Sequence, residues 1–251
     1  MKNGTDKTLM LGTCNYKCPK CKDTTWVITL NGARRCECYE MDYIKRLWEN
    51  YGIKAEEVKK LNDFKTFDSL TTNLKNKAYK YITQFNEIYT SRENSFGILG
   101  QSGSGKSHVS IAIGAALLNK NYKVVYMPYL EVMRELKANS MDDEYYNKLI
   151  NRYKKAEVLV IDDLFKDKVK SGRLTGELTE ADMKHIYPIL NFRYANRLAT
   201  IFSTECTLSQ IVELDEALTG RMVEMCGENC IEIIGKEYNY RLKKLLLKEV
   251  N

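Results

Sequence analysis

Residues 98–110 read ILGQSGSGKSHVS, and this stretch decides how the rest of the chain is interpreted. Its centre satisfies the pattern G-x-x-x-x-G-K-[ST], in which glycines let a loop turn its backbone N–H groups around phosphate oxygens. An apolar segment precedes the loop and a helical pattern follows it, which is the context that the motif requires. We therefore predict a phosphate-binding loop made of Gly100, Gln101, Ser102, Gly103, Ser104, Gly105, Lys106 and Ser107.

The loop predicts a nucleoside triphosphate and Mg²⁺ as ligands. Lys106 is expected to reach the β- and γ-phosphates, and the hydroxyl of Ser107 to bind Mg²⁺. The helix that begins here adds the positive end of its dipole. His108 follows the loop directly and is expected to touch the nucleotide.

From residue 95 onward, short apolar segments alternate with helical ones. Segments 96–100, 122–128, 157–162, 199–204 and 229–235 read as strands, and 106–120, 130–139, 144–156 and 180–197 as helices. Strands that are apolar throughout and alternate with helices indicate a parallel sheet covered on both faces. The predicted fold class is therefore α/β, with a central parallel sheet between helices.

Composition divides the 251 residues into three regions. Residues 1–40 are rich in cysteine, and residues 41–92 place apolar and aromatic groups at helical spacing. The α/β pattern occupies 93–251. We expect a metal-binding module, a helical connector that also binds a partner, and a nucleotide-binding domain.

A second motif, EVLVIDDLF at 157–165, ends an apolar strand in the carboxylates Asp162 and Asp163. In ATPases with such a loop, an acidic residue at the end of this strand secures Mg²⁺, here Asp162. Its neighbour, Asp163, can polarise the attacking water as a general base. The pair lies at a spacing from the loop that suits ATP hydrolysis.

Three further polar groups are candidates for contact with the nucleotide. The strand ATIFST runs into Thr204 and Glu205, and either could face the γ-phosphate. Arg221 in EALTGRMVEM and Arg241 in GKEYNYRLKK could neutralise charge on a transferring phosphoryl group.

Taken in order, LGQSGSGKSH, VLVIDDLF, TIFSTECTLSQIVELDEALTGRMVEM and GKEYNYRLKK resemble the DnaC/DnaI-type helicase loaders and the related IstB-type transposition ATPases, both of the AAA+ class. The resemblance implies ATP as the nucleotide and makes Asp162 and Asp163 the Walker B pair. It places sensor 1 at 203–205, where many loaders have Asn; Thr204 and Glu205 are the candidates here. Arg221 would be an arginine finger acting on a neighbour's ATP, and Arg241 would be sensor 2 in the same subunit.

This resemblance also implies assembly and slow hydrolysis. A finger that acts across an interface requires self-association, or assembly on a helicase. The Walker B pair is Asp-Asp rather than Asp-Glu, and a shorter carboxylate reaches less far toward a water. This favours a slow switch over a processive motor.

Five cysteines crowd into residues 14–38 of a chain whose start does not read as an export signal, which indicates a metal rather than disulfides. The dipeptide Asn31-Gly32 favours a hairpin that returns one cysteine pair to the other. The predicted Zn²⁺ ligands are Cys18, Cys21, Cys36 and Cys38, and Cys14 is a fifth cysteine that leaves the choice of ligands open. The alternatives are an Fe–S cluster, a redox function and free cysteines. A closed Cys₄ site is structural.

The remaining expectations concern location and partners. No segment is apolar enough to span a membrane, so we expect a cytoplasmic protein. The formal net charge of +6 suits an anionic partner, and single-stranded DNA is the candidate. A replicative DNA helicase is the protein partner that the resemblance implies. An IstB-like helper of DNA transposition and a nucleotide-binding scaffold with little hydrolysis stay open as alternatives.

Overall fold

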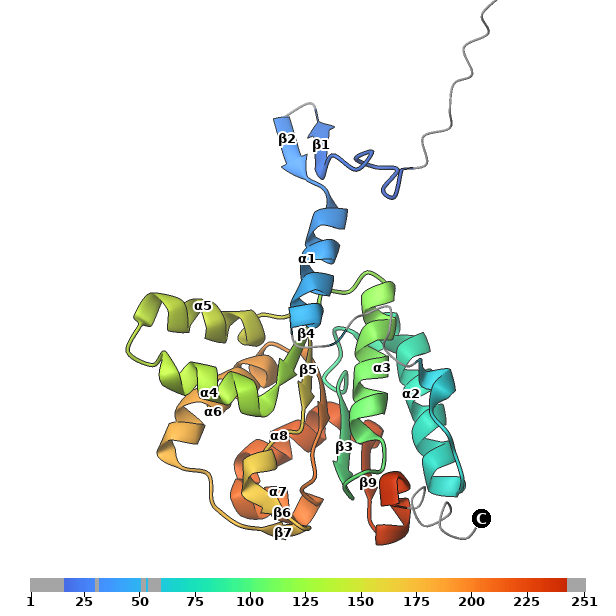
Figure 1. The fold of residues 1–251 in the computed structure, drawn as a ribbon, viewed down its shortest axis with the longest axis vertical. Helices are drawn as coiled ribbons and strands as arrows, with labels where there is room; N and C mark the ends of the chain where they lie inside the picture. The colour runs from blue at the N-terminus through green and yellow to red at the C-terminus, as the bar shows by residue number, and fades with distance from the viewer. Residues whose placement is uncertain (1–15, 30–31, 51–52, 54–59, 243–251) are drawn as a thin grey trace, which may run out of the picture. The chain divides into compact units, whose positions relative to one another are not determined.

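The computed structural model describes residues 16–29, 32–50, 53 and 60–242 (Figure 1). The chain divides into two compact units, Met1–Tyr43 and Ile44–Asn251. Each unit is described by itself. Within the described residues, no helix combines the length and the apolar character that crossing a membrane requires.

The first unit contains a small antiparallel hairpin. Strand β1 (Trp26–Thr29) pairs with β2 (Gly32–Arg35), so that Trp26 lies opposite Arg35. Helix α1 (Glu37–Asn50) begins four residues earlier than the helical pattern at 41 predicts. The reason is local: Cys36 N–H donates to Thr25 O at 2.8 Å, which closes the hairpin, and Tyr39 N–H donates to Cys36 O, which starts the helical turn.

The second unit is built on a parallel sheet of five strands in the order β4-β5-β8-β3-β9. This confirms the predicted α/β class. Strand β8 lies between β3 and β5, so the phosphate-loop strand and the carboxylate strand both border it. The strands are β3 (Phe96–Gly100), β4 (Val124–Pro128), β5 (Val158–Asp162), β8 (Ala199–Ser203) and β9 (Cys230–Ile233).

Helices cover both faces of this sheet (Figure 1). On one face lie α2 (Ser69–Ile88) and α3 (Lys106–Asn119), with α3 packed on β5 and β8. The other face carries α4 (Tyr129–Ala138), α5 (Asp143–Lys154), α6 (Glu180–Ala195) and α8 (Glu216–Cys226). Shorter elements are η1 (Leu61–Asp63), η2 (Lys166–Lys168), β6 (Val169–Lys170), β7 (Arg173–Leu174), α7 (Leu208–Leu214), η3 (Gly227–Asn229) and η4 (Lys236–Tyr238).

Side-chain caps fix where several of these helices begin. Asp68 accepts from Thr71 N–H at 2.7 Å ahead of α2, and Thr179 accepts from Asp182 N–H at 3.1 Å ahead of α6. Such caps satisfy backbone donors that the first helical turn leaves unpaired. Helix α6 continues through Pro188, as the sequence predicts.

Arg193 is a fully buried cation on α6. Its guanidinium donates to the carbonyl oxygens of Tyr153 at 3.1 Å and Ala156 at 2.7 Å, and to the hydroxyl of Thr200 at 2.9 Å. Tyr153 lies in the last turn of α5, where the helix dipole favours positive charge, Ala156 lies just before β5, and Thr200 is the second residue of β8. The side chain therefore ties α5 and α6 to the end of the sheet opposite the phosphate loop.

Trp48 anchors the end of α1 in the core of the second unit. Its side chain is fully buried, and its indole N–H donates to Val124 O at 2.9 Å. A Cβ at Gly114 of α3 would come within 2.9 Å of the Trp48 ring, so a glycine makes this close approach possible.

Replacement of Trp48 by Ala is expected to lower the free energy of unfolding by about 3–5 kcal/mol, because it leaves a large cavity beside α3. Urea unfolding followed by circular dichroism measures the change. Trp26→Ala is the matched control, since that ring is 44% exposed and should cost less than about 1 kcal/mol. Equal midpoints for Trp48→Ala and the unaltered chain would contradict the packing described.

Candidate nucleotide-binding site

The phosphate loop follows β3 and ends at the first turn of α3. Gly105 is the N-cap of α3 with a φ of 89°, a left-handed conformation that L side chains seldom adopt. Gly100 has a φ of 97°, and a Cβ there would overlap the carbonyl oxygen of Ile233. The glycines of the motif are therefore required by the path of the chain at both ends of the loop.

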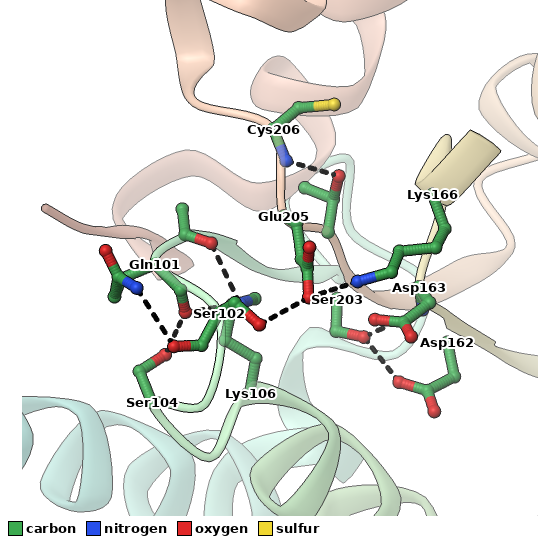
Figure 2. A network of polar contacts seen from close by, with 12 residues as sticks. Gln101, Ser102, Ser104, Lys106, Asp162, Asp163, Lys166, Ser203, Glu205 and Cys206 are labelled. Carbon is green, nitrogen blue, oxygen red and sulfur yellow. Dashed lines mark hydrogen bonds and ion pairs between the residues drawn. The ribbon is translucent and has the colours of Figure 1, made fainter. Parts of the chain in front are cut away.

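Lys106 points back into its own loop (Figure 2). Its Nζ donates to Gly100 O at 2.9 Å and to Gln101 O at 2.7 Å, and only 5% of the residue is exposed. Burial lowers the pKa of Lys106 to about 8, although nearby carboxylates, with Glu205 foremost, oppose the shift. In this structure, the two loop carbonyls occupy the ammonium group of Lys106.

The carboxylate pair lies where β5 ends. Asp162 accepts from Tyr126 OH at 3.0 Å and from Ser203 Oγ at 2.5 Å, so both its oxygens have a donor. Asp163 has a φ of 55°, and its N–H donates to Ser203 Oγ at 3.1 Å. Burial, followed by the charge of Asp162, raises the pKa of Asp163. An elevated pKa suits a group that accepts a proton.

Strand β8 brings three consecutive polar residues to this edge. Ser203 holds the carboxylate pair, a role that the sequence analysis did not single out. Thr204 is fully buried, and its hydroxyl donates to Leu164 O at 2.7 Å and accepts from Cys206 N–H at 3.1 Å. These bonds fix the turn after β8. Thr204 contacts the phosphate loop only through its carbonyl oxygen, which accepts from Gly100 N–H at 3.1 Å, whereas Glu205 contacts it through its side chain.

Glu205 lies between the phosphate loop and the segment after Asp163 (Figure 2). It accepts from Ser102 Oγ at 2.7 Å and forms an ion pair with Lys166. Burial alone would raise the pKa of Glu205, but the hydrogen bonds from Lys166 and Ser102 outweigh it and hold the pKa below its usual value. Sequence reasoning missed Lys166; a basic residue three positions after the carboxylate pair is the available signal.

The C-terminal segment contacts the loop directly. Tyr240 N–H donates to Gly103 O at 3.0 Å, and a Cβ at Gly103 would overlap the side chain of Asn239. Arg241, the next residue, is exposed.

His108 and Ser107 occupy the first turn of α3. The Nε2 atom of His108 lies 3.3 Å from Lys60 O, and its ring contacts Phe64 edge-on with centroids 5.7 Å apart. The structure therefore joins His108 to the segment before α2. Ser107 is partly buried next to Lys106.

Arg221 lies on α8. Its Nη1 atom donates to Tyr187 OH at 2.9 Å and to Asn191 Oδ1 at 2.7 Å, both on α6, and its guanidinium lies 5.8 Å from the ring centroid of Tyr194. These described contacts hold it on the α6–α8 surface of its own subunit.

Four thiols gather in the first unit. The Sγ atoms of Cys18, Cys21, Cys36 and Cys38 all lie within 4.8 Å of one another. The Cys18–Cys36 and Cys21–Cys38 sulfur distances are 3.7 and 3.5 Å. A tetrahedral Zn²⁺ with bonds of about 2.3 Å has sulfur atoms about 3.8 Å apart, so the cluster fits the ion. Cys14 lies outside the described residues.

Comparison with known proteins identifies the family. A family model described as an IstB-like ATP binding protein matches residues 45–247. The chain belongs to the IstB-like ATP-binding family. It is 32% identical over 253 residues to the phage-like element PBSX protein XkdC of Bacillus subtilis (strain 168), an alignment that covers 95% of the chain and 91% of that protein.

The family is related to helicase loaders. The replicative helicase loader DnaI of Bacillus subtilis (strain 168) is 29% identical over 159 residues, covering 58% of the chain and 48% of DnaI. A crystal structure of DnaI superposes with a TM-score of 0.55 at 22% identity, covering 71% of the chain and 89% of that structure. This likeness shows the AAA+ fold and confirms the predicted architecture.

ATP affinity of this IstB-like protein is expected to fall about tenfold between pH 7 and pH 9. ATP binds the ammonium form of Lys106, which loses its proton as the pH rises through a pKa of about 8. Displacement of a fluorescent ATP analogue measures the affinity. Circular dichroism at each pH excludes unfolding, and an affinity that is constant or rises would contradict the buried state of Lys106.

Zinc content is expected to be about one atom per chain, falling to nearly none in Cys36→Ser, because a closed site needs all four thiolates. Elemental analysis of protein purified under reducing conditions measures it. Cys230→Ser is the matched control, since Cys230 lies outside the cluster. Full zinc content in Cys36→Ser would contradict the assignment.

Proposed function

We propose that this chain is an ATPase that binds a replicative DNA helicase and delivers it to single-stranded DNA. The observation that carries the ATPase part is the meeting of the ends of β3, β5 and β8 in one polar network. Ser102, Glu205 and Lys166 join the phosphate loop to the turn that follows the carboxylate pair, where Lys166 N–H donates to Asp163 O at 3.0 Å (Figure 2).

Each residue has a role in the proposed reaction. Lys106 binds the β- and γ-phosphates, while Ser107 and Asp162 hold Mg²⁺, with Ser203 orienting Asp162. When bound, Mg²⁺ neutralises charge that develops on the phosphates. Asp163 accepts a proton from the attacking water, and Glu205 responds to the γ-phosphate.

Two arginines complete the proposed site. Arg241 contacts the nucleotide within the subunit, supported by the bond from Tyr240 to the loop. Arg221 acts on the nucleotide of a neighbouring subunit, where one positive group can stabilise the transferring phosphoryl group. Hydrolysis then depends on self-association or on assembly templated by the helicase. An isolated subunit should turn over slowly.

The loader part of the proposal is supported by the named relative DnaI and by the four-cysteine cluster. We assign zinc binding to residues 1–40, a helical connector that contributes to partner binding to 41–92, and the ATPase domain to 93–251. The helicase is the protein partner, and single-stranded DNA is the second ligand.

The proposal predicts an ATP-dependent complex with the replicative helicase that this protein serves. Purified chain and helicase, mixed with a non-hydrolysable ATP analogue, should co-elute in size-exclusion chromatography. Lys106→Ala should abolish the effect of the nucleotide. Absence of any complex with every nucleotide would overturn the helicase assignment and leave the ATPase assignment standing.

A second candidate is an ATPase helper of DNA transposition. The match to an IstB-like family model supports it. Such a helper would bind double-stranded target DNA and recruit a transposase. Strong ATP-dependent binding to duplex DNA, together with no binding to a helicase, would favour it.

A further inference from the structure

The carboxylate of Glu205 contacts one hydroxyl group and one ammonium group, which come from two different elements. Ser102 Oγ, on the phosphate loop, donates to its Oε1 atom at 2.7 Å. The Nζ atom of Lys166, on η2, forms an ion pair with the same oxygen. An anionic oxygen on the β8 turn therefore joins the phosphate loop to η2 (Figure 2).

The backbone directs Lys166 toward this point. Asp163 and Phe165 both have left-handed conformations, with φ values of 55° and 59°. Lys166 N–H donates to Asp163 O at 3.0 Å, which closes the turn after β5. Non-glycine residues adopt this conformation at a cost, so its occurrence twice in three residues marks a turn held by its surroundings.

The charges around the Glu205 carboxylate favour an anion at this position. Lys106 and Lys166 are both close enough to Glu205 to lower its pKa, and Lys166 also acts on Lys106 itself. The Lys166 side chain is 31% exposed and that of Glu205 is 17% exposed, so the pair is partly shielded from water. Like charges repel, and two ammonium groups near one another favour an anion between them.

We propose that Lys166 binds the γ-phosphate of ATP and that Glu205 is an internal anion which this phosphate displaces. The proposal rests on the proposed function, because it takes the phosphate loop as the ATP site. A γ-phosphate oxygen replacing the Glu205 carboxylate meets the same donors, Ser102 Oγ and Lys166 Nζ. ADP has no γ-phosphate and leaves the ion pair of Glu205 and Lys166 intact.

This arrangement makes Lys166 a residue that distinguishes ATP from ADP. Binding of ATP exchanges one ion pair for another and releases Glu205 from Lys166. The ion pair that links the turn after β8 to the turn after β5 is therefore broken only when the γ-phosphate is present. Hydrolysis of ATP to ADP removes the γ-phosphate and allows the ion pair of Glu205 and Lys166 to form again.

Dissociation constants of a non-hydrolysable ATP analogue and of ADP test the proposal. Lys166→Met should weaken the ATP analogue about tenfold while changing ADP less than about twofold, since one charge-assisted contact is lost. Lys166→Arg should restore most of the preference. Glu205→Gln should bind the ATP analogue about threefold more tightly, because the competing charge is gone. Lys170→Met, exposed in the neighbouring strand β6, should match the unaltered chain.

An equal effect of Lys166→Met on both nucleotides would overturn the proposal, and so would weaker binding of the ATP analogue to Glu205→Gln. These are binding measurements without hydrolysis, so they remain decisive whatever the turnover of the protein. Failure of the unaltered chain to hydrolyse ATP in any assembly would instead contradict the proposed function.

Discussion

Asp163→Asn should reduce ATP hydrolysis by about a hundredfold or more while changing ATP affinity less than about threefold. The amide keeps the size of the side chain and the N–H bond to Ser203, which the backbone makes. It cannot accept the proton of the attacking water. Single-turnover release of labelled phosphate, with displacement of a fluorescent analogue for affinity, measures the two quantities.

Asp167→Asn is the matched control for this prediction. Asp167 lies on η2 close to Asp163 in sequence and pairs with Lys168 rather than with the phosphate loop. Its loss should leave hydrolysis within about twofold. If Asp163→Asn hydrolysed ATP as fast as the unaltered chain, the protein would be a nucleotide-binding scaffold rather than an ATPase.

Arg221→Ala should lower hydrolysis in the assembled state by about a thousandfold, the lower end of what arginine fingers contribute. The structure holds Arg221 on Tyr187 and Asn191 of α6, so the substitution also removes a structural contact. Asn191→Ala removes part of that contact and keeps the guanidinium. Retained hydrolysis in Asn191→Ala therefore separates a chemical role from a structural one.

Mixing two inactive proteins tests whether Arg221 acts across an interface. An equimolar mixture of Arg221→Ala and Asp163→Asn places intact Asp163 beside an intact neighbouring Arg221 at about a quarter of random interfaces. The rate of ATP hydrolysis by the mixture should rise toward about a quarter of the rate of the unaltered assembly. Activity no greater than that of the separate variants would show that Arg221 does not act between subunits.

The fold could be predicted from the sequence because its signals are local and periodic. Segment 96–100 is β3, and the segments at 157–162 and 199–204 each contain a strand of the observed sheet. Apolar runs alternating with helices leave few arrangements other than a covered parallel sheet. The spacing of Cys18, Cys21, Cys36 and Cys38 likewise anticipates the observed cluster.

The details of the candidate site could not be predicted because they depend on which way single side chains point at the ends of strands. Consecutive residues alternate in direction, so Ser203 faces Asp162, Thr204 turns into the packing, and Glu205 reaches Ser102. Lys166 joins them only because two left-handed residues redirect the chain. The sequence does not show which residues adopt these left-handed conformations, and the only signal that it offers for Lys166 is a basic residue three positions after the carboxylate pair.

Contacts between buried residues that lie far apart in the sequence could not be predicted either. The indole of Trp48 meets Val124 O, and the guanidinium of Arg193 meets Tyr153 and Ala156. Each contact exists only after the sheet and helices have packed. Both residues read from the sequence as ordinary members of helical patterns.

Delivery of the helicase to DNA tests the central claim most directly. Purified replicative helicase is mixed with circular single-stranded DNA that carries an annealed oligonucleotide and is coated with single-strand binding protein. Displacement of the oligonucleotide is then measured with and without this chain. The account predicts displacement that requires both the chain and ATP and is lost with Lys106→Ala. Equal displacement with and without the chain would contradict it.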